Sequence, residues 1–257
     1  MQKEIQYKLS SLNLGTIRYF DSIGSTNDEA LAWAAQGAPD LSLILADEQT
    51  SGRGRAGRKW ASPRGTSLAL SLILRPRPSE SDTPSLFTGL AALALVDALK
   101  SRSLSAQIKW PNDVLLNRKK CAGILVESVW TGDALDAVVI GIGVNVLAGS
   151  VPPAQELLFP ATSLEGEAGR PLDRSELVRD VLSAILKWRP LMGQQKFIAA
   201  WESALVFKGE DVQVWQDNES PLKGRVMGLA PDGNLRLLVN DIIVTVHFGE
   251  IHLRPAL

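Results

Sequence analysis

The chain has 257 residues, of which 45% are hydrophobic and 21% are charged, with 27 basic and 28 acidic side chains. This composition is typical of a soluble globular protein, and the length fits one to two domains of roughly 150 residues. The single cysteine excludes an internal disulfide, so we expect a reducing compartment, the cytoplasm. The net charge of −1 gives no general attraction to nucleic acid or to an anionic membrane.

The N-terminus, the apolar stretches and the few His and Cys residues exclude several classes of function. The N-terminus lacks the apolar core of a signal peptide, and the longest apolar stretches, 67–74 and 86–99, are shorter than the ~20 residues that cross a bilayer. Two histidines, His247 and His252, together with Cys121 are too few for the usual zinc clusters. A Ser-His-Asp triad would need its histidine from the end of the chain.

The first predicted elements alternate between helix and strand. Ser25 and Asp28 have the spacing of a capping pair before a helix rich in alanine and leucine, which ends near Gly37. Short apolar runs predict strands at 41–46 and 67–74. The stretch between these two strands is polar and rich in glycine and arginine.

The middle of the chain predicts one helix followed by a meander. Pro84 suits the start of a mostly buried helix over 86–99, because proline there loses no hydrogen bond. Between 107 and 146, apolar runs separated by turns predict successive antiparallel strands. Helix and strand signals do not alternate regularly, which favours an α+β fold over a repeated βαβ plan.

The C-terminal part predicts two helices and then a different kind of structure. After a loop over 149–170, Asp173 and Glu176 open a helix that ends near Trp188, and a second helix covers 194–205. The runs DVQVWQ, LKGRVMGLA, NLRLLV and DIIVTVHF, separated by the turns DNESP and PDGN, then predict a small β-barrel. We therefore predict a first domain over 1–206 and a second over 207–257.

The segment GRGRAGRKW, Gly52–Trp60, contains a formal G-x-G-x-x-G pattern. A dinucleotide fingerprint should lead from a strand into a helix, whereas this segment leads towards another strand, so that interpretation is weak. Its glycines and four basic residues can still bind an anion through backbone N–H groups and guanidinium groups. The alternatives are a solvated basic loop or a nucleic-acid patch. The four basic residues are Arg53, Arg55, Arg58 and Lys59.

Three shorter motifs also carry candidate chemistry. KWPND at 109–113 is a good turn, but Asp113 at a strand end can also hold Mg²⁺ or orient a basic group. Lys119 and Lys120 fit a solvated turn, or a point charge that faces a polyanion at the mouth of a buried strand. Asn145 lies in an apolar run and is either a hydrogen-bonding core residue or a ligand contact.

The order of these motifs resembles the biotin protein ligase family, also called biotin–[acetyl-CoA-carboxylase] ligase. The similarity extends from about Phe20 to Val146, and the stretches at 161–164 and 249–251 are also similar. The motifs are STN at 25–27, EQTSGRGRAGRKW at 48–60, KWPND at 109–113, KCAGILVE at 120–127 and GIGVN at 141–145.

The resemblance implies a fold as well as a function. It implies a catalytic domain like that of class II aminoacyl-tRNA synthetases, with a mixed, largely antiparallel sheet and flanking helices, followed by an SH3-like β-barrel. Bifunctional members carry an N-terminal helix-turn-helix, whereas only about twenty residues precede Phe20. We therefore expect the monofunctional type without a DNA-binding role. Our hypothesis for the barrel is that it covers the site or docks the acceptor.

The resemblance also implies a reaction and a set of site residues. ATP and biotin, with Mg²⁺, would form biotinyl-5′-AMP, and the biotinyl group would pass to a lysine of a biotin carboxyl carrier protein domain. Lys120, Arg55 and Asp113 would be catalytic, with Asp113 supporting either magnesium or Lys120. The implied biotin contacts are Ser25, Thr26, Asn27, Gln49, Arg53, Gly54, Arg55 and Lys120. The implied ATP and adenylate contacts are Arg53, Arg55, Arg58, Trp60, Lys120 and Asn145.

This chemistry agrees with the composition of the chain. Both nucleophiles, the biotin carboxylate and the acceptor lysine, come from substrates, so the enzyme needs fixed cationic and N–H donors rather than His or Cys. Ala56 stands where some members carry a further arginine, which predicts weaker ordering of the phosphates.

Two rival functions and the oligomeric state stay open. A lipoate or octanoate ligase or transferase has a related fold and acylates the same kind of acceptor. A non-catalytic biotin-binding sensor would keep the pocket but is expected to lose the cationic set. Edge strands can pair with a second copy in a homodimer, with a carrier domain or with neither.

Overall fold

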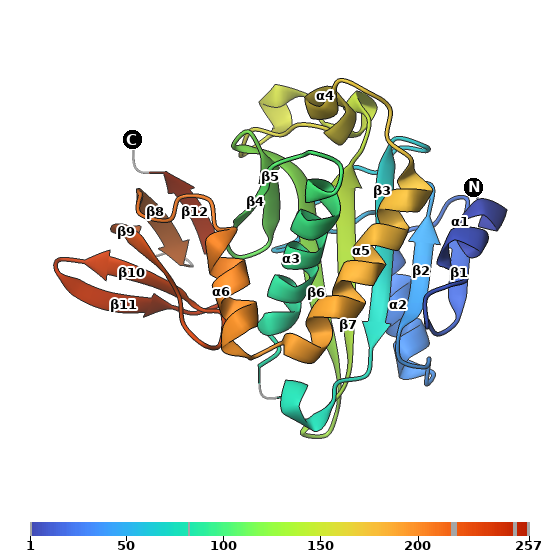
Figure 1. Ribbon diagram of the computed structural model, residues 1–257, viewed down its shortest axis with the longest axis horizontal. Helices are drawn as coiled ribbons and strands as arrows, with labels where there is room; N and C mark the ends of the chain where they lie inside the picture. The colour runs from blue at the N-terminus through green and yellow to red at the C-terminus, as the bar shows by residue number, and fades with distance from the viewer. Residues whose placement is uncertain (1, 82, 217–219, 249–250, 256–257) are drawn as a thin grey trace.

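The computed structural model of this chain describes residues 2–81, 83–216, 220–248 and 251–255. Its centre is a seven-stranded sheet with the order β1-β2-β3-β7-β6-β5-β4 (Figure 1). The β1–β2 pair is parallel and each other neighbouring pair is antiparallel. The strands are β1 (Ile17–Phe20), β2 (Ser42–Ala46), β3 (Ser67–Leu74), β4 (Ala106–Lys109), β5 (Asp113–Leu116), β6 (Lys119–Thr131) and β7 (Ala134–Asn145).

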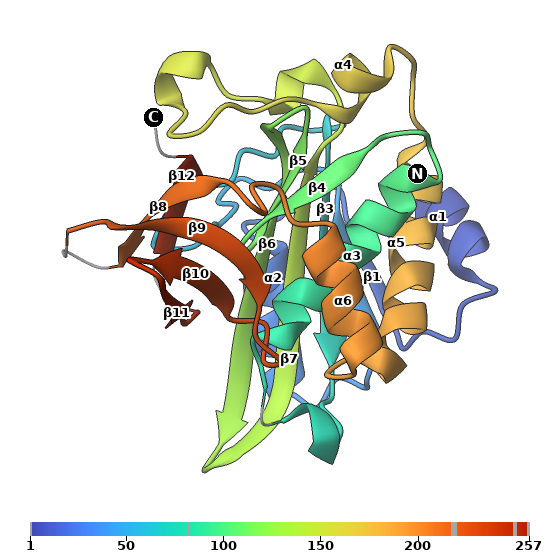
Figure 2. The same ribbon diagram turned by 60° about the vertical axis from the view of Figure 1, so that its left-hand side comes forward.

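Helices cover both faces of this sheet. The long helices α3 (Leu86–Lys100) and α5 (Arg174–Trp188) lie side by side on one face, and α2 (Thr26–Ala35) lies on the other (Figures 1 and 2). Most of α3 is buried, as its apolar sequence predicts. The Ser25 hydroxyl accepts a hydrogen bond from the backbone N of Asp28 at 3.4 Å, which confirms the predicted cap of α2.

The last strands form a second, five-stranded antiparallel sheet beside α6 (Gln195–Ser203), with the order β11-β10-β9-β8-β12 (Figure 2). The predicted α+β class, with its mixed and largely antiparallel sheet, is thereby confirmed. The domain boundary between residues 206 and 207 stays a prediction. The strands are β8 (Asp211–Gln216), β9 (Leu222–Leu229), β10 (Leu235–Val239), β11 (Ile242–Val246) and β12 (Ile251–Pro255).

Four elements were not predicted from the sequence. The helix α1 (Gln2–Leu9) buries only Ile5 and Leu9, so its periodic signal is weak. The others are the short strand β1, the one-turn helix α4 (Leu164–Ala168) in the predicted loop, and β12. The 3₁₀ turns are Pro78–Glu80, Ala148–Ser150, Ala154–Glu156 and Arg189–Leu191.

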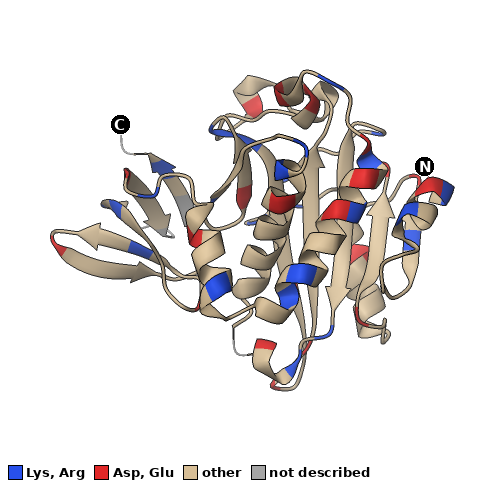
Figure 3. Cartoon of the chain, in the orientation of Figure 1, with Lys and Arg blue, Asp and Glu red and all other residues tan. Residues whose placement is uncertain are grey.

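Some expectations concern residues that the structure does not describe. Most of the predicted DNESP turn, at 217–219, and residues 249–250 of the closing motif lie outside the described residues. Basic and acidic residues are interspersed along the elements of the face that carries α3 and α5 (Figure 3). Within the described ranges, no helix combines the length and apolarity needed to span a bilayer.

Candidate functional site

Glycines on two central strands form the floor of a pocket beside the N-terminus of α2. Gly123 of β6 and Gly143 of β7 are partners across the sheet, and Gly141 lies two residues away on the same face of β7. A Cβ atom at Gly143 would overlap the indole of Trp60, and one at Gly141 would overlap the amide of Asn27. The missing side chains therefore allow Trp60 and Asn27 to lie directly on the sheet.

The segment Gly52–Trp60 forms a tight hairpin over this floor, where the sequence predicted only a polar loop. The backbone N of Gly54 donates to the carbonyl oxygen of Arg58 at 2.7 Å. Ala56 and Gly57 at the tip have φ values of +53° and +68°, the positive values that a type I′ hairpin turn requires. The next regular element is β3 rather than a helix, so the G-x-G-x-x-G pattern is no dinucleotide fingerprint here.

Arg53 ties this hairpin to the rest of the pocket. Its guanidinium donates to both carboxylate oxygens of Glu127, at 3.0 and 2.8 Å, and approaches Asp28 Oδ1 at 2.7 Å. The hydrogen bond to Glu127 and the nearby negative charges hold the pKa of Arg53 above its ordinary value. Glu127 also accepts a hydrogen bond from Asn27 Nδ2 at 2.8 Å. The charge of Arg53 is thus matched by carboxylates, and its side chain fastens the hairpin to α2 and β6.

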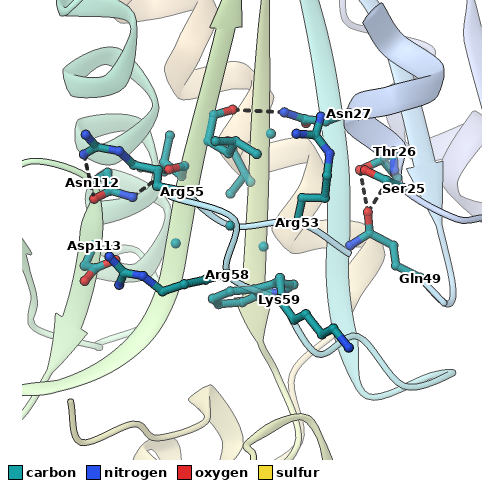
Figure 4. Close-up of a pocket in the computed structure, with 18 of the residues that line it drawn as sticks. Ser25, Thr26, Asn27, Gln49, Arg53, Arg55, Arg58, Lys59, Asn112 and Asp113 are labelled. Carbon is teal, nitrogen blue, oxygen red and sulfur yellow. Dashed lines mark hydrogen bonds between the residues drawn. The ribbon is translucent and has the colours of Figure 1, made fainter. Parts of the chain in front are cut away.

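A second polar network orients the N-terminus of α2 (Figure 4). The backbone N and the hydroxyl of Thr26 lie 2.8 and 3.0 Å from Gln49 Oε1, to which both donate. The hydroxyl of Ser71 on β3 lies 2.8 Å from Thr26 Oγ1 and 2.6 Å from Asn27 Oδ1. Ser25, Thr26 and Asn27 are all buried. These contacts fix the direction of each polar group that faces the pocket.

A cluster of charges lies at the other end of the pocket, with Asp113 and Lys109 buried and Lys120 partly exposed. One carboxylate oxygen of Asp113 lies 2.6 Å from Lys120 Nζ, and the other lies 3.2 Å from Lys109 Nζ. Burial by itself would raise the pKa of Asp113, but the charges and hydrogen bonds of Lys120 and Lys109 outweigh it and lower the pKa to about 2. At neutral pH this group of three carries a net positive charge, which favours binding of an anion.

Two arginines of the hairpin face the same end. Arg55 Nη1 donates to Asn112 Oδ1 at 3.3 Å, and Arg58 points towards Asp113, whereas Lys59 points away from them (Figure 4). The sequence grouped the four basic residues of the hairpin as one anion site. In the structure only Arg55 and Arg58 turn towards the KWPND turn, because Arg53 binds carboxylates and Lys59 projects outwards.

The pocket consists of two adjoining cavities. The inner cavity has a volume of about 130 Å³ and lies between the hairpin, α2 and the glycine floor. The outer cavity is larger, about 890 Å³, and extends towards the segment 150–161 and β12. Trp60 and Lys120 line both cavities, and the Lys120 ammonium lies 5.3 Å from the Trp60 ring. A two-part ligand can therefore span the cationic cluster.

The outer cavity includes Asn145, whose side chain is held in place by Thr162. Asn145 Nδ2 donates to the carbonyl oxygen of Thr162 at 3.2 Å. The backbone of Lys120 pairs with the same segment, through hydrogen bonds with Pro160 at 2.7 Å and Thr162 at 2.9 Å. The stretch at 161–164 that the sequence singled out therefore lies against both Lys120 and Asn145.

The residues predicted for the site come together in these cavities. The sequence did not predict three parts of the site, which are Lys109, Glu127 and the floor glycines. Glu127 lies four residues after Gly123 on β6, and Gly141, Gly143 and Asn145 follow one another at every second position of β7. Residues at such even spacing lie on one face of a strand, so this period of two was the signal that could have found them. Predicted residues lining the inner cavity are Ser25, Thr26, Asn27, Gln49, Arg53, Gly54, Arg55, Arg58, Trp60, Asp113 and Lys120, and Asn145 lines the outer one.

The two roles predicted for Asp113 do not fit this geometry equally well. Each of its carboxylate oxygens already faces an ammonium group. The contacts therefore favour the orientation of Lys120 over the direct binding of Mg²⁺.

Comparisons with known proteins point to one family. Residues 19–145 match the model of the biotin/lipoate A/B protein ligase family. The bifunctional ligase/repressor BirA of Bacillus subtilis is 35% identical over 257 residues, which cover 98% of this chain and 78% of that protein. The biotin–[acetyl-CoA-carboxylase] ligase of Paracoccus denitrificans is 39% identical over 198 residues, 73% of this chain and 80% of that protein.

The fold is similar to that of a solved structure with both small molecules bound. This is the biotin protein ligase from Aquifex aeolicus in complex with biotin and ATP, with a TM-score of 0.81 and 28% sequence identity. The similarity covers 94% of this chain and 99% of that one.

Proposed function

Because this chain belongs to the biotin/lipoate A/B protein ligase family and is a biotin protein ligase, we propose that it works in two steps. Biotin and ATP first form biotinyl-5′-AMP with release of pyrophosphate. The biotinyl group then passes to a lysine of a biotin carboxyl carrier domain, such as that of acetyl-CoA carboxylase. The names of the relatives support this acceptor.

One observation carries the proposal: a net cationic cluster around the buried Asp113 lies where an inner and an outer cavity meet. Asp113 contacts two lysines, Arg58 points towards it, and Arg55 donates to the adjacent Asn112. The first step must bring two anions together, the biotin carboxylate and the α-phosphate of ATP. Fixed cations at the junction lower the cost of that approach and stabilise the charge that develops on the phosphate.

The proposal assigns biotin to the inner cavity. Thr26, Asn27 and Gln49 offer oriented polar groups to a small heterocycle, together with Ser25 and the hairpin backbone around Gly54. The biotin carboxylate would then point towards Lys120. Because Arg53 is bound to two carboxylates, its proposed contribution is to keep the hairpin backbone over the ligand.

The outer cavity is assigned to the nucleotide. Trp60 offers an aromatic surface, and Asn145 lies at the edge of the same cavity. Arg55 and Arg58 are placed for the phosphates. We take Mg²⁺ to arrive with the ATP phosphates, where it would neutralise their charge, because Asp113 is occupied by lysines.

The bond changes follow from this placement. An oxygen of the biotin carboxylate attacks the α-phosphorus, and the bond from that phosphorus to pyrophosphate breaks. The acceptor lysine, as a neutral amine, then attacks the acyl carbon. AMP leaves with the electron pair of the broken C–O bond, and the nitrogen of the new amide loses one proton to water. Lys120 donates hydrogen bonds to the oxygens that gain charge. Both nucleophiles come from the substrates, so no nucleophile of the chain is consumed.

The rival functions are less well supported. A lipoate or octanoate ligase has the same class of fold. The relatives from Paracoccus denitrificans and Mycobacterium tuberculosis, however, are biotin–[acetyl-CoA-carboxylase] ligases. A biotin sensor would not need the cationic cluster, which this chain retains.

The test is a transfer assay with purified protein, ATP, Mg²⁺, biotin and an isolated carrier domain. Mass spectrometry should show the carrier gain one biotinyl group, and a carrier whose acceptor lysine is replaced by arginine should gain none. Modification with lipoate or octanoate alone would assign the chain to the related activity. Biotin binding without any transfer would instead support the sensor.

A further inference from the structure

The KWPND motif is joined to the C-terminal sheet through Trp110. This side chain is 1% exposed and directly follows Lys109. Its indole Nε1 donates to the carbonyl oxygen of Gly233, in the PDGN turn between β9 and β10, at 3.0 Å. Its ring makes an edge contact with Phe248, with the centroids 5.0 Å apart. Both partners belong to the last fifty residues of the chain.

The turn that accepts this hydrogen bond is itself fixed. Gly233 has a φ of +82°, and a Cβ there would contact the ring of Trp201, so glycine is required for this conformation. Asn234 Oδ1 accepts from the backbone N of Phe248 at 2.9 Å, and the Ser85 hydroxyl donates to the carbonyl of residue 232 at 2.8 Å. The carbonyl of Gly233 is therefore held in a defined direction.

The strand that leads into the motif, β4, is also held by the segment that connects α6 to the C-terminal sheet. Ile108 N donates to Ala204 O at 2.7 Å, and Val206 N donates to Ile108 O at 2.9 Å. Lys109 thus lies between two anchored neighbours, Ile108 and Trp110. Lys109 pairs with Asp113 of the next strand, so these contacts adjoin both residues of the ion pair.

We propose that Trp110 is a positioning residue through which the C-terminal sheet holds the Lys109–Asp113 pair, and thereby the Lys120 ammonium, in the geometry for adenylate formation. This inference rests on the two-step reaction proposed above. It gives the C-terminal sheet a part in the first half-reaction, whereas a covering or docking role alone would affect the second. A displacement of the cations by about 1 Å is enough to cost up to ~10²-fold in rate.

Two variants test the contact between Trp110 and the C-terminal sheet, one on each side of that contact. Trp110→Phe removes the N–H donor and keeps an aromatic ring, and Phe248→Leu changes the C-terminal side without altering the motif. Trp188→Phe is the matched control, because Trp188 Nε1 also donates a hydrogen bond, to Asp97 Oδ2 at 2.8 Å, and its ring makes an edge contact with Phe197.

The readouts are biotin-dependent exchange of pyrophosphate into ATP, biotin KM and urea unfolding. We expect Trp110→Phe and Phe248→Leu to lower the kcat of exchange at least about tenfold, with biotin KM changed less than about twofold, since the proposed contacts of Thr26, Asn27 and Gln49 with the biotin heterocycle are untouched. Trp188→Phe should lose comparable stability but keep its kcat.

Two results would overturn the inference. One is a kcat loss no greater than that of Trp188→Phe in both variants. The other is unchanged exchange combined with slower transfer to the carrier, which would assign the C-terminal sheet to docking. If the unaltered protein shows no biotin-dependent exchange, the proposed reaction fails instead, so the two failures are distinguishable.

Discussion

Replacing Asp113 with asparagine should lower both stability and activity, and the stability loss can be estimated from the structure. The carboxyl group is buried between Lys109 and Lys120, and its pKa is about 2 against an ordinary 3.8. That difference corresponds to about 2 kcal/mol of stabilisation at pH 7. Asp113→Asn should cost at least this much, because it also leaves two ammonium groups facing each other without an anion.

The pH dependence of this loss follows from the direction of the pKa change. The folded-state pKa of Asp113 is depressed, so its contribution is complete above the unfolded-state pKa and is lost as the pH falls towards 2. By this linkage about half of the contribution should be gone near pH 3. The stability gap between the original protein and Asp113→Asn should therefore be constant above about pH 5 and narrow below about pH 4.

Urea unfolding between pH 3 and pH 7 measures this gap. The matched control is Asp97→Asn, because Asp97 also accepts from two donors, Lys187 Nζ and Trp188 Nε1, both at 2.8 Å, but is more exposed. Its loss should stay below about 1 kcal/mol. Equal stability of Asp113→Asn and the control, or a stability deficit that persists unchanged at pH 3, would refute this role of the Asp113 carboxylate.

Three further substitutions address separate parts of the site. Glu127→Gln should weaken biotin binding about tenfold in calorimetry, since it releases the Arg53 contact that keeps the hairpin in place. Gly143→Ala should raise the KM for ATP at least about tenfold in initial-rate assays, because the new methyl group displaces Trp60 from the sheet. Lys120→Ala should lower turnover by roughly 10² to 10³ by removing a donor to the developing charge.

Matched control variants separate these local effects from a general loss of protein stability. Glu210→Gln breaks a bidentate contact with Arg118, with both distances 2.9 Å, on an exposed part of the chain, and should leave biotin affinity unchanged. Gly24→Ala adds a methyl group in open space and should leave the KM for ATP unchanged. Equal effects in control and test variants, or unaltered adenylate formation in Lys120→Ala, would remove the residue concerned from the site.

Local signals in the sequence predicted much of the fold. The run at 67–74 is the strand β3, and the Ser25 and Asp173 caps begin α2 and α5 as expected. Each of these depends on residues close together in the chain. The strand β1 was missed because it has only four half-buried residues and gains its place by pairing with β2.

The site was predicted less completely, for a physical reason. The motifs identified most of the residues that line the two cavities, but not the contacts that orient them. Arg53 meets Glu127 across 74 positions of sequence, and Trp110 meets Gly233 across 123. Such pairs depend on strand register and on the packing of the second sheet, which composition and periodicity do not specify.

The most direct test of the proposed reaction is exchange of labelled pyrophosphate into ATP, with biotin, lipoate and octanoate supplied in turn to the purified protein and Mg²⁺. We expect exchange with biotin and none with the other two acids, and a large loss of exchange in Lys120→Ala. Exchange with lipoate or octanoate alone, or tight biotin binding without exchange, would contradict it.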